Sequence, residues 1–231
     1  MSQTNINTQT IVDNIRHVSA NIKMPRDHID YLKKLKTDGF EPKVIYDIGS
    51  CVGHWTKEAK EIWPDAIYYL FEGNRDVEFL YKEKSDPYFI GILSNQSGKI
   101  VKWYENKMLF GGNSYYREND DRYFPESNHT YRITHALDDV VSSLAIPPPD
   151  LVKIDVQGAE KDIIAGGIKS LSKATHLVIE IQDVDYNIGA PKAHETIPYI
   201  EKVLNVKCVA PKLCDNGPDA DYGFTKTFIS E

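Results

Sequence analysis

Apolar residues recur three and four positions apart through the first forty residues of the chain, and this spacing predicts helices. The apolar positions are Ile11, Ile15, Val18 and Ile22, followed by Ile29, Leu32 and Leu35. Pro25 divides the two runs, and Gly39 follows the second, where glycine commonly ends a helix. Residues 1–40 are therefore predicted to form an N-terminal helical segment.

From residue 44 onward, short apolar runs alternate with helical patterns. The predicted strands are 44–48, 67–71, 88–93, 151–156 and 177–181, and the predicted helices are 55–62, 77–84, 159–168 and 197–204. Strands that alternate with helices pair in parallel, so we expect an α/β fold with a Rossmann-like, doubly wound sheet. Two late runs, 207–211 and 224–229, lack a helix between them and predict an antiparallel hairpin at one sheet edge. The 231 residues fit a single domain.

One segment, residues 106–134, interrupts this alternation. It contains the pair Gly111-Gly112 and several aromatic residues among many polar ones. Long connections without secondary structure are uncommon unless they are functional or disordered, and the aromatic content argues against disorder. We therefore expect the segment to be an ordered insertion next to a binding site.

The turn after the first predicted strand carries the first candidate site. Asp47, Gly49, Ser50 and Gly53 stand where a strand enters a helix. Ligands of doubly wound sheets bind at the strands' carboxyl ends, and glycine lets the backbone approach them closely. The turn lacks the Gly-x-Gly-x-x-Gly of dinucleotide sites. It suits a ligand with an amino group and a nucleoside but no phosphate. S-adenosylmethionine is therefore the expected cofactor, and methyl transfer the expected activity.

The next two predicted strands also end in polar residues. Glu72 and Asn74 follow the second strand, where a carboxylate could accept both hydroxyls of a ribose because it carries only acceptors. The alternative is that Glu72 is a solvated loop carboxylate. Ser94 and Asn95 follow the third strand, where they could meet the edge of an adenine ring or simply form a turn.

The fourth alternating strand contains charged residues within an apolar run. Lys153 and Asp155 lie two positions apart and therefore project from the same face of the strand, with Gly158 and Glu160 opening the next helix. Charged residues are rarely buried without a partner, so we expect an ion pair or a shared substrate site. A pair that only orders the strand end is the structural alternative.

The fifth strand places Glu180 beside Asp155 at the same sheet edge. Two such carboxylates could act as a general base and its partner, or could share a divalent cation through hard oxygen ligands. The sequence leaves both options open. His135, which follows the aromatic segment, is the first histidine candidate for moving a proton, ahead of His54 and His176.

Composition narrows the range of partners. The net charge of -7 and the lack of any long basic run disfavour a nucleic acid. The sequence shows neither a membrane-length apolar run nor a signal peptide, and its three cysteines form no metal-binding pattern. We therefore expect no membrane insertion and a cytoplasmic location. The oligomeric state cannot be predicted.

Four motifs together resemble the FkbM family of S-adenosylmethionine-dependent methyltransferases. They are residues 44–53 (VIYDIGSCVG), 70–74 (LFEGN), 137–141 (LDDVV) and 151–160 (LVKIDVQGAE). The family usually has Glu where this chain has Gln157, and often Pro where it has Gly73. The resemblance covers residues 44–182. It implies a class I methyltransferase fold and O-methylation, commonly of sugars or of hydroxyls on secondary metabolites.

These observations lead to a mechanistic hypothesis. Asp155 would remove the proton from a sugar hydroxyl, with Lys153 and Glu180 setting its charge and orientation. Candidate residues for binding the sugar or glycan are Ser114, Tyr115, Tyr116 and Tyr123, because aromatic rings offer a surface to the apolar faces of sugars. A packed cap over the sheet is the alternative role for this segment. Other acceptors, a small metabolite or a protein, stay open, as does an inactive module that keeps only the fold.

Overall fold

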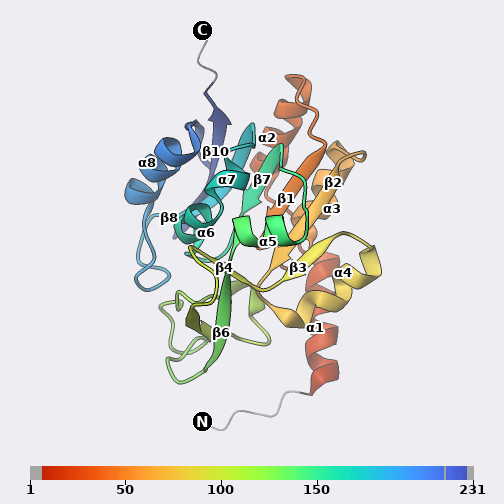
Figure 1. The fold of residues 1–231 in the computed structure, drawn as a ribbon. Coiled ribbons are helices and arrows are strands. Elements are labelled where there is room, and N and C mark those ends of the chain that lie inside the picture. The colour runs from red at the N-terminus through yellow and green to blue at the C-terminus, as the bar shows by residue number, and fades with distance from the viewer. Residues whose placement is uncertain (1–6, 216, 228–231) are drawn as a thin grey trace.

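A computed structural model describes residues 7–215 and 217–227 as an α/β fold with two sheets (Figure 1). The strands of the larger sheet are β1 (Val44–Ile48), β2 (Ile67–Glu72), β3 (Tyr88–Ile90), β7 (Leu151–Ile154), β8 (His176–Gln182), β9 (Val206–Asp215) and β10 (Asp219–Lys226). The smaller sheet contains β4 (Ile92–Ser94), β5 (Ile100–Tyr104) and β6 (His129–Ala136).

The larger sheet has the order β3-β2-β1-β7-β8-β10-β9. The first five strands are parallel, whereas β10 is antiparallel to both β8 and β9. The predicted doubly wound sheet with an antiparallel edge hairpin is thus confirmed. Chain order reverses between the neighbours β1 and β7, and such a switch point is where ligands bind in this class of sheet. Residues 228 and 229, included in the predicted last strand, lie outside the described residues.

Helices cover both faces of this sheet. They are α1 (Thr8–Asn21), α2 (Arg26–Thr37), α3 (His54–Ile62), α4 (Glu78–Lys84), α5 (Leu137–Ser143), α6 (Glu160–Gly166), α7 (Ile168–Leu171) and α8 (Ala193–Leu204). Two short 3-10 helices are η1 (Arg75–Val77) and η2 (Phe110–Gly112). Figure 1 shows α5, α6 and α7 in front of the sheet and α2 and α3 behind it.

Two apolar cores result, one on each face of the sheet. Successive strand residues point to opposite faces, so Tyr46 and Ile48 pack with α5 to α8, whereas Ile45 packs with α1 to α4. The two predicted N-terminal helices are confirmed on either side of Pro25. Among the described residues, no helix is both long and apolar enough to cross a membrane.

The single strand predicted at 88–93 is wrong, because the chain changes sheets at Gly91. β3 stays in the larger sheet, and β4 pairs with β6 in the smaller one. A Cβ on Gly91 would lie 2.6 Å from the ring of Phe89 and 3.2 Å from that of His135. A side chain at this crossing would require the Phe89 ring to shift, and the apolar run on either side gives no sign of the break.

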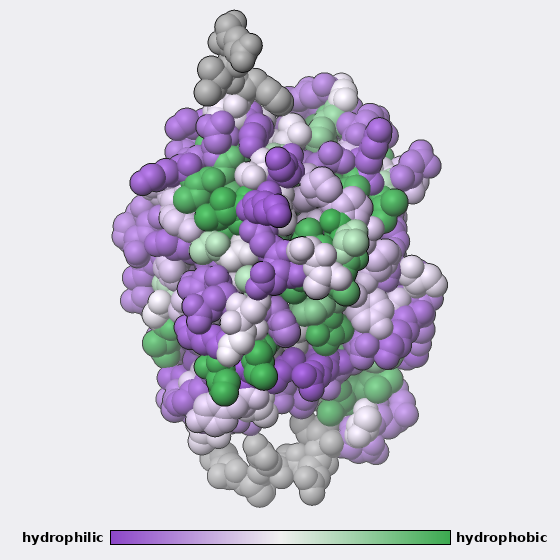
Figure 2. All heavy atoms as spheres, viewed as in Figure 1, coloured by the Kyte–Doolittle hydropathy of each residue, from purple (hydrophilic) through white to green (hydrophobic). Residues whose placement is uncertain are grey.

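The insertion predicted at 106–134 is bounded by strands that the sequence pattern did not reveal. β5 precedes it, and its last residues belong to β6, which pairs antiparallel with β5. Ile100, Tyr131 and Ile133 are 58–68% exposed on this hairpin, so no apolar alternation marks a buried face. Figure 2 shows hydrophobic residues among hydrophilic ones in the lower part of the view, where β6 lies.

Candidate active site

A cavity of about 250 Å³ opens at the carboxyl ends of β1, β2, β7 and β8. Its lining joins the turn after β1, the end of β2, β4, the insertion and the turn after β7. A second cavity of about 210 Å³ lies beside it, under the link between α1 and α2. Both cavities are lined by Ile22, Gly49, His54, Asp155 and Glu180. These residues therefore form the junction between them.

The turn after β1 needs glycine at position 49. Gly49 has φ of 83°, and a Cβ there would lie only 1.7 Å from the carbonyl oxygen of Asp155. The turn thus contacts the end of β7 directly, and Gly49 lines both cavities. Gly53, with φ of 70°, forms the N-cap of α3 and lines neither cavity. The close approach explains why the motif requires a residue without a side chain.

Asp47 and Ser50 hold this turn in place. Asp47 is 1% exposed and accepts a hydrogen bond from the Thr56 hydroxyl at 2.5 Å. Burial raises the pKa of Asp47 to about 7. Ser50 is hydrogen-bonded to the Tyr81 hydroxyl at 2.8 Å. Both residues line the second cavity rather than the larger one.

Glu72 stands at the end of β2 with its carboxylate held by the backbone. The N–H of Cys51 donates to Oε2 at 2.8 Å, and the N–H of Asn74 donates to Oε1 at 2.7 Å. Burial raises the pKa of Glu72, while these N–H groups act in the opposite direction. A carboxylate oxygen carries two lone pairs, so each can accept a further bond from a ligand in the cavity.

Several buried polar atoms in the wall of the larger cavity lack partners. Among the described residues, six buried side-chain nitrogen or oxygen atoms have no hydrogen bond. Four of the six belong to cavity-lining residues: His54 Nδ1, Asn74 Nδ2, Trp103 Nε1 and Asn113 Nδ2. Buried polar groups are nearly always hydrogen-bonded in native proteins. Their clustering here marks a wall built to receive a polar ligand.

Part of the lining of the larger cavity is apolar. Ile92 and Leu93 of β4, with Ala159 and Ile163, contribute apolar side chains to it. Ser94 and Asn95 line neither cavity. Ser94 Oγ is within hydrogen-bond distance of the Tyr115 hydroxyl, at 3.3 Å, and Asn95 is exposed. The structure therefore does not bring these two residues to the ligand space.

Asp155 and Glu180 meet at the junction of the two cavities. The Gln157 amide donates to Asp155 Oδ1 at 3.4 Å and to Glu180 Oε2 at 3.2 Å. Burial and the charge of Asp155 hold the pKa of Glu180 well above its usual range. This raised pKa favours the protonated form of Glu180, which can donate a hydrogen bond to Asp155.

Lys153 supplies the positive charge below this pair. Its Nζ lies 3.6 Å from Asp155 Oδ2 and donates to Asp221 Oδ1 at 2.7 Å. Burial alone would lower the pKa of Lys153, but the charges of Asp221 and Asp155 raise it above its ordinary value. The predicted ion pair between Lys153 and Asp155 is present. Its closer partner, Asp221, was missed because nothing in the sequence links β10 to β7.

The aromatic segment is divided between the cavity wall and the surface. Ser114 and Tyr115 line the larger cavity, and Ser114 Oγ donates to the Gln157 carbonyl at 2.8 Å. The hydroxyls of Tyr115 and Tyr116 both donate to Asp162 Oδ2 at 3.0 Å, which pins them to α6. Tyr116 and Tyr123 line neither cavity, and Tyr123 is 43% exposed.

His135 also lies away from the junction. Its ring packs edge-on against Phe89 at a centroid distance of 5.3 Å, and it lines neither cavity. His54, which the sequence ranked lower, lines both. Burial lowers the pKa of His54, so its imidazole is neutral at pH 7.

The donor groups around Asp155 and Glu180 do not suit a divalent cation. The Gln157 amide and the Lys153 ammonium both point hydrogen-bond donors at this pair. A cation would have to displace them and would be repelled by Lys153. Within residues 7–215 and 217–227, no group of three or more His, Cys, Asp or Glu side chains is placed to hold a metal ion.

Comparison with known proteins identifies the family. The profile described as "Methyltransferase FkbM domain" matches residues 47–207. "2-O-methyltransferase NoeI" of Sinorhizobium fredii is 26% identical over 195 residues, covering 77% of this chain and 76% of that protein. "Hexuronic acid methyltransferase AglP" of Haloferax volcanii is 27% identical over 163 residues, covering 68% of this chain and 63% of that protein. The chain thus spans less than two thirds of the length of the second relative.

Solved structures support the fold. An O-methyltransferase family protein from Burkholderia thailandensis has a TM-score of 0.53 at 6% identity, covering 96% of this chain and 61% of that chain. The O-methyltransferase TomG from Streptomyces achromogenes, solved in complex with S-adenosylmethionine, has a TM-score of 0.50 at 11% identity, covering 98% of this chain and 92% of that chain. The resemblance seen in the sequence motifs is confirmed: the chain belongs to the FkbM family and is a methyltransferase.

Proposed function

We propose that this methyltransferase transfers the methyl group of S-adenosylmethionine to a hydroxyl of a sugar or glycan. The observation that carries the proposal is the carboxyl pair Asp155–Glu180 at the junction of two cavities. One cavity has the features of a nucleoside site, and the other is lined mainly by polar residues. The relatives support the acceptor class, since one is named a 2-O-methyltransferase and the other a hexuronic acid methyltransferase.

The larger cavity fits the donor. Glu72 offers the two oxygens of its backbone-held carboxylate to a ribose diol, and Asn74 offers an unpartnered amide nitrogen. The apolar lining residues Ile92, Leu93 and Ile163 suit the faces of an adenine ring. When bound, S-adenosylmethionine supplies a methyl group activated by a sulfonium. Gly49 keeps the backbone open to the donor at the junction.

Asp155 is the proposed general base. The raised pKa of its partner Glu180 favours the protonated form, which would not compete for the hydroxyl proton. The Gln157 amide fixes the two carboxyl groups, and Lys153 below them stabilises the negative charge of Asp155. Removing the proton as the bond to carbon forms would add about 10²–10⁴-fold to the rate. Alignment of the two reactants would contribute about 7–11 kcal/mol.

The acceptor hydroxyl would reach Asp155 where the cavities join. Ser114 and Tyr115 stand on the larger-cavity side of this junction. Lys23 and Ser50 line the second cavity and His54 lines both, and these residues offer hydrogen-bonding groups to a polyol. The tyrosine ring and the surrounding polar groups together suit a sugar, which has apolar faces and hydroxyl edges.

The test is a panel of acceptors followed by product analysis. The purified protein is incubated with S-adenosylmethionine and either neutral sugars, hexuronic acids, non-sugar alcohols or a peptide bearing serine and threonine. Mass and linkage analysis of a methylated sugar supports the proposal. Methylation of only the non-sugar alcohol or the peptide contradicts it, as does methylation of a nitrogen in place of an oxygen.

A further inference from the structure

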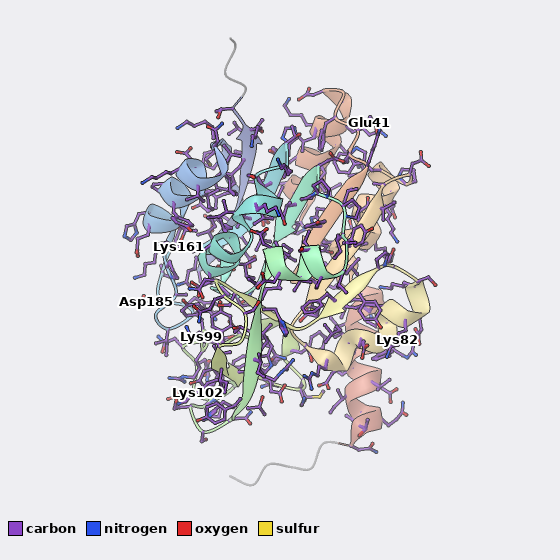
Figure 3. All side chains as sticks on the ribbon, in the orientation of Figure 1. Glu41, Lys82, Lys99, Lys102, Lys161 and Asp185 are labelled. Atoms are coloured by element: carbon purple, nitrogen blue, oxygen red, sulfur yellow. The ribbon has the colours of Figure 1, made fainter. Side chains whose placement is uncertain are left out.

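The ion pair between Lys153 and Asp221 is among the most buried charged contacts of the molecule. Their side chains are 5% and 4% exposed. Most other ion pairs lie at the surface, and Figure 3 shows Glu41, Lys82 and Asp185 around the outside of the molecule. Taking two charges out of water is costly unless further hydrogen bonds complete the arrangement. The buried pair therefore requires additional hydrogen-bonding groups around it.

His28 of α2 supplies the missing partner. Its Nδ1 lies 3.0 Å from Asp221 Oδ2, while its Nε2 accepts a hydrogen bond from the Trp55 indole at 2.9 Å. An indole N–H can only donate, so Nε2 carries no proton, and Nδ1–H donates to Asp221. His28 is thus a neutral imidazole of fixed tautomer, 2% exposed.

Both oxygens of Asp221 are consequently occupied. Oδ1 accepts from Lys153 and Oδ2 accepts from His28. Burial alone would raise the pKa of Asp221, but these two neighbours hold it well below its ordinary value. The carboxylate is therefore a fixed negative charge whose position depends on His28.

Asp221 in turn fixes the position of the Lys153 ammonium. The ammonium lies 2.7 Å from Asp221 and 3.6 Å from Asp155, so it is shared unequally between the two carboxylates. If Asp221 moved, the Lys153 ammonium would approach Asp155 and stabilise the negative charge of the Asp155 carboxylate more strongly. A base that is paired too closely with a cation is a poorer proton acceptor.

We propose that His28 and Asp221 are positioning residues for the reaction. They keep the Lys153 ammonium at a distance from Asp155 that leaves this carboxylate free to accept the hydroxyl proton. This inference rests on the proposed function of Asp155. Both residues lie outside the 47–207 segment that matches the family profile, so the N-terminal helix α2 and strand β10 take part in building the site.

The two nitrogens of His28 can be tested separately. Asparagine places an amide near the position of Nδ1, and glutamine places one near that of Nε2. His28→Asn therefore keeps the donor to Asp221, whereas His28→Gln keeps the acceptor for Trp55. His176→Gln is the matched control, because His176 also contacts β10, through Thr225, but lines neither cavity.

The expected result is a split between the two variants. His28→Gln lowers kcat by about 10- to 100-fold, the loss expected from a misplaced catalytic group. Its affinity for S-adenosylmethionine, measured by calorimetry, stays at the wild-type level. His28→Asn and His176→Gln keep kcat close to wild type. Equal kcat values for the two His28 variants overturn the proposal, whether both are low or both are high, because a merely structural role does not distinguish Nδ1 from Nε2.

A measurement without acceptor separates this inference from the proposed function. The ¹⁵N resonances of the His28 ring report its tautomer, and the proposal requires Nδ1–H in the wild-type protein. An Nε2–H tautomer overturns the inference whatever the acceptor is. If no sugar is methylated but Nδ1–H is found, the proposed function fails and the hydrogen-bonded network stands.

Discussion

Glu72 and Asp155 are both carboxylates in the wall of the larger cavity, but they are held in opposite ways. Backbone N–H groups of two neighbouring turns hold Glu72. Side chains hold Asp155, namely Gln157 and Lys153 directly and Asp221 behind them. A backbone-held carboxylate changes little when a neighbouring side chain is substituted. When side chains hold a carboxylate, substitutions at several positions can change its pKa. This arrangement suits a group that must gain and lose a proton.

The strongest test of this contrast is Asp155→Asn. The amide keeps the shape of the side chain but cannot accept the hydroxyl proton, so kcat should fall by about 10²–10⁴-fold. Donor affinity should stay near wild type because Glu72 and Gly49 are untouched. Steady-state kinetics and calorimetry measure the two quantities, with the exposed Asp185→Asn as control. A large loss of donor affinity would instead assign Asp155 to donor binding.

The next largest effect is expected for Glu72→Gln. Both oxygens of Glu72 accept from backbone N–H groups, so an amide must turn its NH₂ toward one of these donors. Losing hydrogen bonds to a charged group costs about 1.5–3 kcal/mol. That corresponds to about a 10- to 100-fold weaker Kd for S-adenosylmethionine. At a saturating concentration of S-adenosylmethionine, kcat should return to the wild-type value. An unchanged Kd would show that Glu72 does not bind the donor.

A smaller effect is expected from Gln157→Glu, which restores the residue usual in the FkbM family. A third carboxylate beside Asp155 and Glu180 raises the proton affinity of the pair. The acid limb of the kcat profile should then move to higher pH, by about one unit. The pH dependence of kcat for both proteins measures this shift. An unchanged profile would show that position 157 does not face the reacting carboxyl groups.

The smallest effect on turnover is expected for Glu180→Gln. The raised pKa of Glu180 favours its neutral, protonated form, which glutamine resembles, so kcat at pH 7 should change only a few-fold. The free energy of unfolding should change more than kcat does. A carboxyl whose folded pKa is raised stabilises the protein below its ordinary value of about 4.3 and loses that contribution as pH rises toward the folded pKa. The urea midpoint of the variant should therefore exceed that of wild type by a margin that grows as the pH rises above about 4.3, and parallel pH curves would contradict this.

The sequence predicted those parts of the molecule that depend on neighbouring residues. The turn from Asp47 to Gly53, the end of β2 and the strand from Lys153 to Asp155 are contiguous motifs, and the structure brings all three to the junction of the cavities or its walls. The parallel pairing of the central strands also follows from the alternation of strand and helix.

The parts that the sequence did not predict depend on contacts between distant segments. Asp221 and His28 are 193 residues apart, and no spacing rule relates them. The change of sheet at Gly91 depends on how closely Phe89 and His135 pack around it. The same break places Ser94 in β4 of the smaller sheet and Asn95 directly after it, and neither residue lines the larger cavity.

The buried pair Lys153–Asp221 also limits how this protein can be cut or recombined. A fragment confined to residues 47–207 would carry Lys153 without Asp221, and Trp55 without His28. Breaking a buried ion pair by removing one partner costs about 3–5 kcal/mol, a large share of the stability of a domain of this size. A chimera that exchanges acceptor preference between relatives must therefore transfer both flanking segments together with the segment between them.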